Sequence, residues 1–349
     1  MGKGVLRSRV FPLVTCCVLA SCMLLLACAC AGTSRTAVSE VTAAVGVAHG
    51  TVPSQGAHSQ QAVQPSELNP TSLLSIPGSS GVISFDAETG ASVAATDASL
   101  DGVRAAVKDI EETSDCGFVF VDAVTGRGLA YNADKVMYIA SAAKAPLVLY
   151  ALQHGAGASA DERGAIEEAI VNSDNDSFES FAYDYTDTGY SQWLSAHDID
   201  HADYANDLYP RMTARSLASI WLGLLQYVQT GSDNALWFSD LLTGTETSFI
   251  RDGLQGVDAT VMNKGGWINE DSEGGLQNDE GEEDEAESAE PVELNDDEMA
   301  YRSVSDAGVI TCDGRTYVMV VLTTQPDGGD AEANVSALAR ALFDVRNVM

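Results

Sequence analysis

Three short motifs, far apart along the chain, carry side chains that could perform acyl transfer. The first is Ser141-Ala142-Ala143-Lys144. Because residues three apart share one face of a helix, a neutral Lys144 could take the proton of the Ser141 hydroxyl. If Ser141 begins a helix, the free backbone N–H groups and the dipole at that end would stabilise an oxyanion. Alone, the motif also fits a serine cap followed by a solvated lysine.

The second and third motifs are Ser173-Asp174-Asn175 and Lys264-Gly265-Gly266-Trp267. Ser-Asp-Asn is common in turns and helix caps, and a lysine before two glycines could form a simple turn. Glycine also lets a ligand approach the backbone closely, and Lys264 could meet a substrate carboxylate. The chain has five lysines and two lie in these motifs, so the set indicates a catalytic site.

The elements that must position these motifs form a predicted α+β fold. Helical spacing dominates from about 140 to 255, with further helices expected from about 98 and over 332–345. Strand patterns lie on both sides of the helical region, at 117–122, 129–132, 259–263, 304–311 and 317–324. We therefore expect an antiparallel sheet of about five strands, flanked by helices from both termini, with an inserted all-helical lobe.

In this order the motifs resemble the Ser-x-x-Lys, Ser-Asp-Asn and Lys-Thr-Gly set of class A β-lactamases and penicillin-binding proteins. The resemblance covers about residues 98–349. It extends to flanking segments that are similar to the family's first hairpin, the helix after its Ω-loop and its last hairpin: Phe118–Asn132, Met212–Arg215 and Asp306–Arg315. It implies a serine hydrolase that works through an acyl-enzyme, and it implies no cofactor and no metal.

The resemblance also implies a role for each matched residue. Ser141 would be the nucleophile, Lys144 would activate it, and Ser173 would relay a proton to the leaving nitrogen. The substrate would be held by the Asn175 amide, by the Lys264 cation and by the strand that carries Gly265, Gly266 and Trp267. The backbone N–H groups of Ser141 and Trp267 would form the oxyanion hole.

Two departures from the family pattern affect the expected activity. Gly265 replaces a residue that usually carries a hydroxyl, which removes a hydrogen bond of about 1–3 kcal/mol to a substrate carboxylate in a dry site. Class A enzymes use an Ω-loop glutamate in deacylation, but no glutamate lies between Glu179 and Glu246. Asp203 or Asp207 could substitute, and nothing in the sequence favours either.

The helical lobe is also shorter than in typical class A enzymes, since Ser173 follows Ser141 by only 32 residues.

Three functions remain open at this point. The first is slow hydrolysis of β-lactams through an acyl-enzyme at Ser141. The second is a D,D-peptidase reaction on peptidoglycan peptides. The third is a degenerate, non-catalytic binding lipoprotein at the cell surface, which the departures at Gly265 and in the Ω region favour. We expect a monomer in each case.

The first residues of the chain predict export. Lys3, Arg7 and Arg9 precede an apolar run, which indicates a signal peptide over 1–27. The sequence Leu25-Leu26-Ala27-Cys28 resembles a lipoprotein signal with Cys28 as the lipidated residue, although ordinary cleavage or an uncleaved anchor also fits. Residues 28–97, rich in Ser, Thr, Ala and Gly, predict a flexible tether. We expect the protein on the outer face of the cytoplasmic membrane or outside the cell.

Composition excludes two classes of function. Of the 349 residues 45% are hydrophobic, so the chain has enough apolar residues for a core. The net charge of −33 argues against binding nucleic acid or an anionic membrane through a basic surface. Fifteen acidic residues and no Lys or Arg lie in 270–298, which predicts a disordered acidic insertion over 269–299. We favour this interpretation over a calcium loop at 269–280.

Cysteine and histidine give no sign of a metal site. Outside the leader only Cys116 and Cys312 remain, and we expect free thiols because the resemblance places them far apart. His197 and His201 lie among aspartates, but a solvated acidic turn is favoured over a metal site because no third ligand group is evident.

Overall fold

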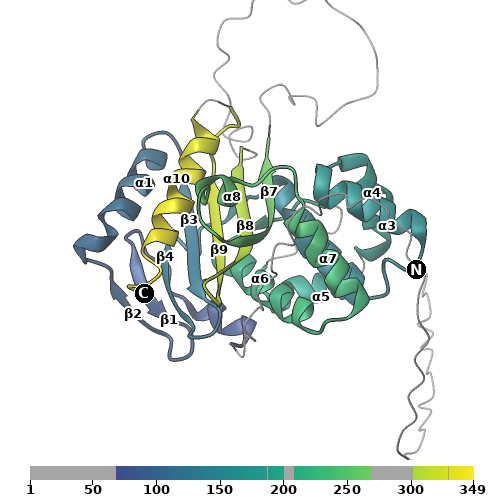
Figure 1. Cartoon of the computed structure of the whole chain (residues 1–349), viewed down its shortest axis with the longest axis horizontal. Coiled ribbons are helices and arrows are strands. Elements are labelled where there is room, and N and C mark those ends of the chain that lie inside the picture. The colour runs from purple at the N-terminus through teal and green to yellow at the C-terminus, as the bar shows by residue number, and fades with distance from the viewer. Residues whose placement is uncertain (1–67, 187, 200–207, 269–301, 329) are drawn as a thin grey trace, which may run out of the picture. The chain divides into compact units, whose positions relative to one another are not determined.

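The computed structural model describes residues 68–349 except 187, 200–207, 269–301 and 329, and this part has an α+β architecture (Figure 1). Its main sheet has seven antiparallel strands in the order β2-β1-β4-β3-β9-β8-β7. Their bounds are Ile83–Asp86 (β1), Ala91–Ala94 (β2), Cys116–Asp122 (β3), Arg127–Tyr131 (β4), Thr260–Trp267 (β7), Val304–Cys312 (β8) and Arg315–Thr323 (β9). The predicted fold class is confirmed, with seven strands in place of about five.

Helices cover both faces of this sheet, and Figure 1 shows α1 and α10 in front of it. One face packs on α1 (Asp101–Glu111), α8 (Phe249–Gly253) and α10 (Ala331–Asp344). The other packs on α2 (Lys144–Gln153) and α6 (Ala214–Gln229). The helical lobe adds α3 (Ala160–Glu167), α4 (Asn175–Ala182), α5 (Thr188–Ala196) and α7 (Asp233–Thr243).

Strand β3 shows why the sheet lies between two helical layers. Successive side chains of a strand point to opposite faces, and every residue of β3 is buried. Phe118 and Phe120 belong to the core with α1 and α10, whereas Val119 and Val121 belong to the core with α2 and α6. Helix α1 completes its side with a stripe of buried residues at helical spacing, Val103, Val107 and Ile110.

Short elements connect these layers. A two-stranded sheet pairs β5 (Met137–Tyr138) with β6 (Arg211–Met212). The short helices are η1 (Pro70–Ser75), η2 (Ala98–Leu100), η3 (Ala140–Ala143) and η5 (Tyr183–Tyr185), together with a π-helical turn, η4 (Glu168–Asn172). The β5–β6 pair matters for the site described below, because β5 directly precedes η3 in the chain.

The predicted tether over 28–97 is wrong for its last part. Residues Leu73 and Ile76 are buried in the core, and β1 pairs with β4 while β2 pairs with β1. These strands have four residues each, and β2 is exposed at every residue, so their apolar residues indicate strands only weakly. They add the strands that the prediction of about five missed.

Several predictions lie outside the described residues: the signal peptide, Cys28 and the acidic insertion. Within the part of the chain that the structure describes, no helix has the length and apolar character needed to cross a bilayer.

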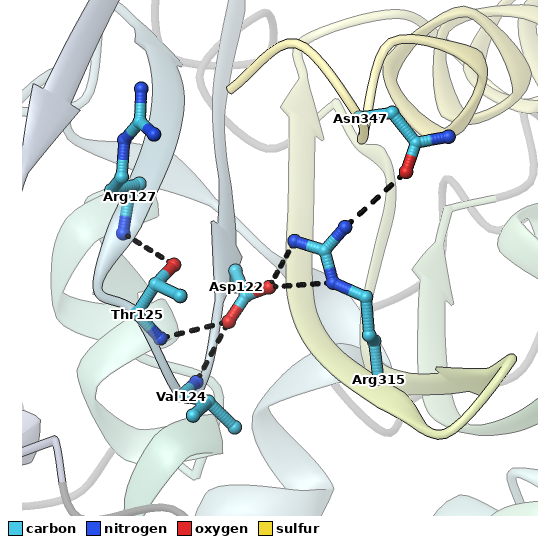
Figure 2. Close-up of polar contacts among 6 residues, drawn as sticks. All are labelled: Asp122, Val124, Thr125, Arg127, Arg315 and Asn347. Carbon is cyan, nitrogen blue, oxygen red and sulfur yellow. Dashed lines mark hydrogen bonds and ion pairs between the residues drawn. The ribbon is translucent and has the colours of Figure 1, made fainter.

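A buried carboxylate at the end of β3 joins three segments of the sheet, as Figure 2 shows. Asp122 accepts hydrogen bonds from the backbone N–H groups of Val124 and Thr125, both at 2.9 Å. Its other oxygen accepts from Arg315 Nε at 3.1 Å and Nη2 at 2.6 Å, and Arg315 Nη1 donates to Asn347 Oδ1 at 3.3 Å. The carboxylate thus connects the β3–β4 turn to the start of β9 and the C-terminal residues.

Replacing Asp122 by alanine should lower the free energy of unfolding by about 2–3 kcal/mol at pH 7, since charged hydrogen bonds would be lost from a buried position. Burial raises the pKa of Asp122, but the hydrogen bonds and the charge of Arg315 outweigh it, so the pKa lies below its ordinary value. The stabilisation is therefore complete above about pH 4, the ordinary carboxyl pKa, and is lost as the pH falls through the lower folded value.

Denaturant unfolding at several pH values measures this difference. The two proteins should converge as the pH is lowered below about 4. Asp344→Ala, which removes an exposed carboxylate paired with Arg340, is the control and should change stability by about 0.5 kcal/mol or less. An Asp122→Ala protein as stable as the wild type at pH 7 would contradict the prediction.

Candidate active site

Ser141 lies in a tight turn that brings it in line with Lys144. The chain forms the 3₁₀ helix η3 here and becomes α-helical only at Lys144, whose backbone N–H donates to Ser141 O. In a 3₁₀ turn, residues three apart lie directly above one another, so the two side chains share a face as predicted. Ala140, just before Ser141, has a φ of 46°. Such a backbone is strained for a non-glycine residue, and strain of this kind gathers at functional sites.

Strand β7 lies against this turn at Gly266. A Cβ atom on Gly266 would be 2.2 Å from Ile139 O, 2.5 Å from Ala142 N and 2.9 Å from Ser141 N. All three are backbone atoms of the turn, so only glycine allows this approach. The strand end that carries Gly266 and Trp267 therefore runs directly beside the backbone N–H of Ser141.

Lys144 is fully buried, and its ammonium finds three acceptors. Its Nζ donates to Ser173 O at 2.5 Å, to Asp174 O at 3.2 Å and to Asn175 Oδ1 at 2.7 Å. Burial lowers the pKa of Lys144 to about 8, although the charges of Asp174 and Glu179 act in the opposite direction. The amine therefore loses its proton more readily than an exposed lysine does.

Ser173 reaches the lysines because the backbone turns sharply around it. The preceding residues form the π-helical turn η4, a feature often found at functional sites. Ser173 itself is left-handed, with a φ of 62°, and Asp174 then caps α4 by accepting from Ser177 N at 2.7 Å. The turn points the Ser173 hydroxyl at Lys264, whose Nζ donates to Ser173 Oγ at 2.9 Å.

Lys264 is also buried, at 2% exposure, and has a carboxylate nearby. Burial and the charge of Lys144 lower the pKa of Lys264 to about 7, while the charge of Asp306 opposes them. Asp306 is fully buried and accepts from Ile250 N and from Asn263 Nδ2, both at 2.9 Å. Burial raises the pKa of Asp306 to about 6.

An aromatic residue that the sequence analysis missed completes the site. The Tyr209 hydroxyl donates to Asn175 Oδ1 at 3.2 Å, and its ring centroid lies 5.9 Å from Lys144 Nζ. The ring of Phe178 lies 5.5 Å from the same atom. The available signal was a tyrosine directly before Pro210 and the predicted helix start at Met212.

The structure thus brings the three motifs together around Ser173. Ser141, Lys144, Asn175, Lys264 and Gly266 lie as described above. The Trp267 ring is 5.7 Å from Lys264 Nζ. Gly265 has room for a side chain, because the nearest atoms to its Cβ position lie at 3.7 Å. Asp203 and Asp207, the suggested substitutes for the missing glutamate, lie outside the described residues.

The remaining candidates lie elsewhere. Cys116 and Cys312 are buried free thiols at opposite ends of the sheet, as predicted. His197 Nδ1 lies 3.0 Å from Ser219 Oγ, and burial lowers its pKa to about 4. His201 is outside the described residues. Among the residues that are described, no group of three or more His, Cys, Asp or Glu is arranged to hold a metal ion.

Three solved structures have a fold similar to that of this chain. The chain matches PBP-A with a TM-score of 0.52 and 16% identity, over 71% of this chain and 97% of that one. It matches a beta-lactamase from Sphaerobacter thermophilus with a TM-score of 0.52 and 17% identity, over 71% and 98%. A class A beta-lactamase from Mycobacterium abscessus gives a TM-score of 0.50 and 16% identity, over 71% and 99%.

At these identities the solved structures establish the fold alone. No curated protein sequence matches the chain. The model of the Beta-lactamase enzyme family matches residues 102–181 and 170–345. These two segments span more than half of the chain and include every residue of the three motifs. The chain therefore belongs to the beta-lactamase enzyme family and has the fold of a class A beta-lactamase-like serine hydrolase.

Proposed function

We propose that this protein forms an acyl-enzyme at Ser141 with β-lactams and hydrolyses it slowly. The observation that carries the proposal is the contact of Lys264 Nζ with Ser173 Oγ at 2.9 Å, while Lys144 Nζ lies 2.5 Å from Ser173 O. It joins the Ser173 hydroxyl to two buried amines, one of which, Lys144, follows Ser141 by three residues on the same face of the turn, and this supports acyl transfer.

In the first step, neutral Lys144 takes the proton of the Ser141 hydroxyl, and Ser141 Oγ attacks the carbonyl carbon of the lactam. The carbonyl oxygen becomes an oxyanion. The N–H groups of Ser141 and Trp267 donate to it, since Gly266 allows β7 to lie beside η3. Lys264 attracts the carboxylate of the substrate.

In the second step, the carbon–nitrogen bond breaks and the nitrogen needs a proton. A protonated Lys264 has only donors, so Ser173 Oγ accepts from it and keeps its own hydrogen for the leaving nitrogen. Ser173 then recovers a proton from the lysines, and the product is an ester on Ser141. The proton that Ser141 loses thus goes to Lys144, and the proton that the leaving nitrogen gains comes from Ser173.

Slow release of the ester follows from the residues near Lys144 and Asn175. The chain has no glutamate between Glu179 and Glu246, and Tyr209 lies against Asn175. Without a glutamate in this region, and with a tyrosine in contact with Asn175, the site lacks the glutamate carboxylate that would activate water for deacylation. A solved structure of a mutant of PBP-A is an acyl-enzyme complex with penicillin-G. For the present protein we expect a long-lived ester on Ser141.

The same lack of a glutamate favours a second candidate, a D,D-peptidase reaction on peptidoglycan peptides. This reaction uses the same acylation step at Ser141, with the terminal D-alanine as leaving group. Rapid β-lactam turnover is not needed for it.

We also propose that the protein is exported and acts as a monomer at the outer face of the cytoplasmic membrane. The support comes from the basic and apolar leader over 1–27 and from Cys28, which follows Leu25-Leu26-Ala27. In this arrangement Cys28 carries a lipid anchor and the site faces peptidoglycan.

Intact-protein mass measurement after incubation with benzylpenicillin tests the proposed chemistry. The wild type should gain the mass of one benzylpenicillin and keep it well after excess drug is removed. Ser141→Ala should gain none, while Ser180→Ala, which removes an exposed hydroxyl on α4, should behave as the wild type does. A peptide ending in D-Ala-D-Ala tests the second candidate through release of D-alanine.

Two results would contradict the proposal. Folded wild-type protein that gains no mass with any penicillin or peptide would favour a non-catalytic binding lipoprotein. Rapid turnover of a chromogenic β-lactam would overturn slow deacylation and would show that another group activates the water.

A further inference from the structure

Asn175 has an orientation that two donors determine. Its Oδ1 accepts from Lys144 Nζ at 2.7 Å and from the Tyr209 hydroxyl at 3.2 Å. Both contacts have the amide oxygen as their acceptor, so this oxygen faces Lys144 and the Tyr209 hydroxyl. The amide nitrogen, with its two N–H groups, therefore points away from both donors. Asn175 is the exposed first residue of α4, so little packing would otherwise hold its side chain.

Tyr209 is itself well anchored relative to Ser141. It comes two residues before β6, and β6 pairs with β5, which ends two residues before η3. The backbone N–H of Arg215 also donates to Ala133 O at 3.0 Å. The Tyr209 ring packs on Phe178, with ring centroids 5.5 Å apart. The hydroxyl is therefore held at a fixed place beside Asn175.

We propose that Tyr209 is a positioning residue of this site, whose hydroxyl holds the Asn175 amide so that its N–H groups face the acylamino side chain of a substrate. The effect on substrates rests on the acyl transfer proposed above, but the effect on Asn175 does not. The proposal predicts that loss of the Tyr209 hydroxyl lowers the acylation efficiency for β-lactams with an acylamino group more than for those without one.

The substitution Tyr209→Phe isolates the hydroxyl, because it keeps the ring that packs on Phe178 and faces Lys144. Loss of one neutral hydrogen bond should reduce the acylation efficiency for benzylpenicillin about 5- to 10-fold. The loss should appear in the apparent affinity more than in the limiting rate. Acylation by 6-aminopenicillanic acid, which has no acylamino group, should change by about 2-fold or less. Tyr183→Phe removes an exposed hydroxyl from the same lobe and should alter neither.

A purely structural role of Tyr209 would lower both rates alike and lower the melting temperature with them. That result, or an unchanged rate with benzylpenicillin, would overturn the proposal.

A second measurement remains decisive if the wild type is never acylated. The side-chain amide signals of Asn175 in a ¹⁵N–¹H spectrum, assigned with Asn175→Asp, should be one sharp pair in the wild type. In Tyr209→Phe they should broaden or shift, while backbone signals of the sheet stay in place. Broadened signals in a protein without acylation would retain the positioning role and reject the proposed function. Unchanged amide signals would overturn the positioning role whatever the activity is.

Discussion

Gly266→Ala is expected to reduce the acylation rate of Ser141 about 1,000-fold. The added methyl would meet Ile139 O at 2.2 Å and Ala142 N at 2.5 Å. These are backbone atoms of the turn before α2, so β7 and η3 must separate. A shift of about 1 Å at a reacting centre costs about 100-fold in rate, and loss of an oxyanion donor costs about 100- to 1,000-fold.

Gly265→Ala is the matched comparison on the same strand. Its methyl would lie 3.7 Å from the nearest atoms, which is an ordinary contact distance. We expect it to keep the fold and most of the acylation rate. Time-resolved mass measurement with benzylpenicillin gives both rates, and thermal unfolding checks that each variant is folded. A folded Gly266→Ala protein with a rate within about tenfold of the wild type would refute the close approach of β7 to η3 as a requirement.

The site residues were predictable because their chemistry depends on residue type and order. Ser141 and Lys144 needed only a turn, and either a 3₁₀ or an α turn places them on one face. That Ser173 and Lys264 would meet could be expected only from the family resemblance. Nothing in the spacing of 91 residues between them shows that their side chains lie 2.9 Å apart.

Tyr209 and Asp306 could not be assigned to the site in the same way. Tyr209 reaches Asn175 through the pairing of β5 with β6, and each of these strands has two residues, too few for any periodic pattern. Asp306 was noted only as part of the last hairpin. Its importance follows from full burial and from hydrogen bonds to Ile250 and Asn263, which are contacts between distant segments.

The strands, like the site residues, differ in how well the sequence predicted them. Strands β3, β8 and β9 were predicted within two residues of their bounds. Strand β7 was predicted to end at residue 263, but it continues through the lysine and the two glycines to Trp267. Strands β1 and β2 are short, and β2 is exposed at every residue, so hydrophobic patterning could not reveal it. Pairing with β4, rather than any local preference, incorporates these residues into the sheet.

Removal of the Lys144 amine should slow the acylation of Ser141 as much as Gly266→Ala does. A general base contributes about 100- to 10,000-fold to a rate, so Lys144→Met should slow acylation about 1,000-fold. The pH profile is the more specific test. With a pKa of about 8, most Lys144 amines are protonated below that pH and cannot accept the Ser141 proton. The wild-type rate should therefore fall about tenfold per pH unit below 8 and level off above it.

In Lys144→Met this pH dependence should disappear, because the group that titrates is gone, while the residual rate stays low. Lys108→Met removes an exposed lysine on α1 and should keep both the wild-type rate and its profile. Acylation rates measured between about pH 6 and 9 separate the possibilities. A wild-type rate independent of pH, or a Lys144→Met rate that still rises with pH through 8, would assign the base to another group. Lys264 would then be the first candidate, since its amine also contacts Ser173 and its pKa is lowered to about 7.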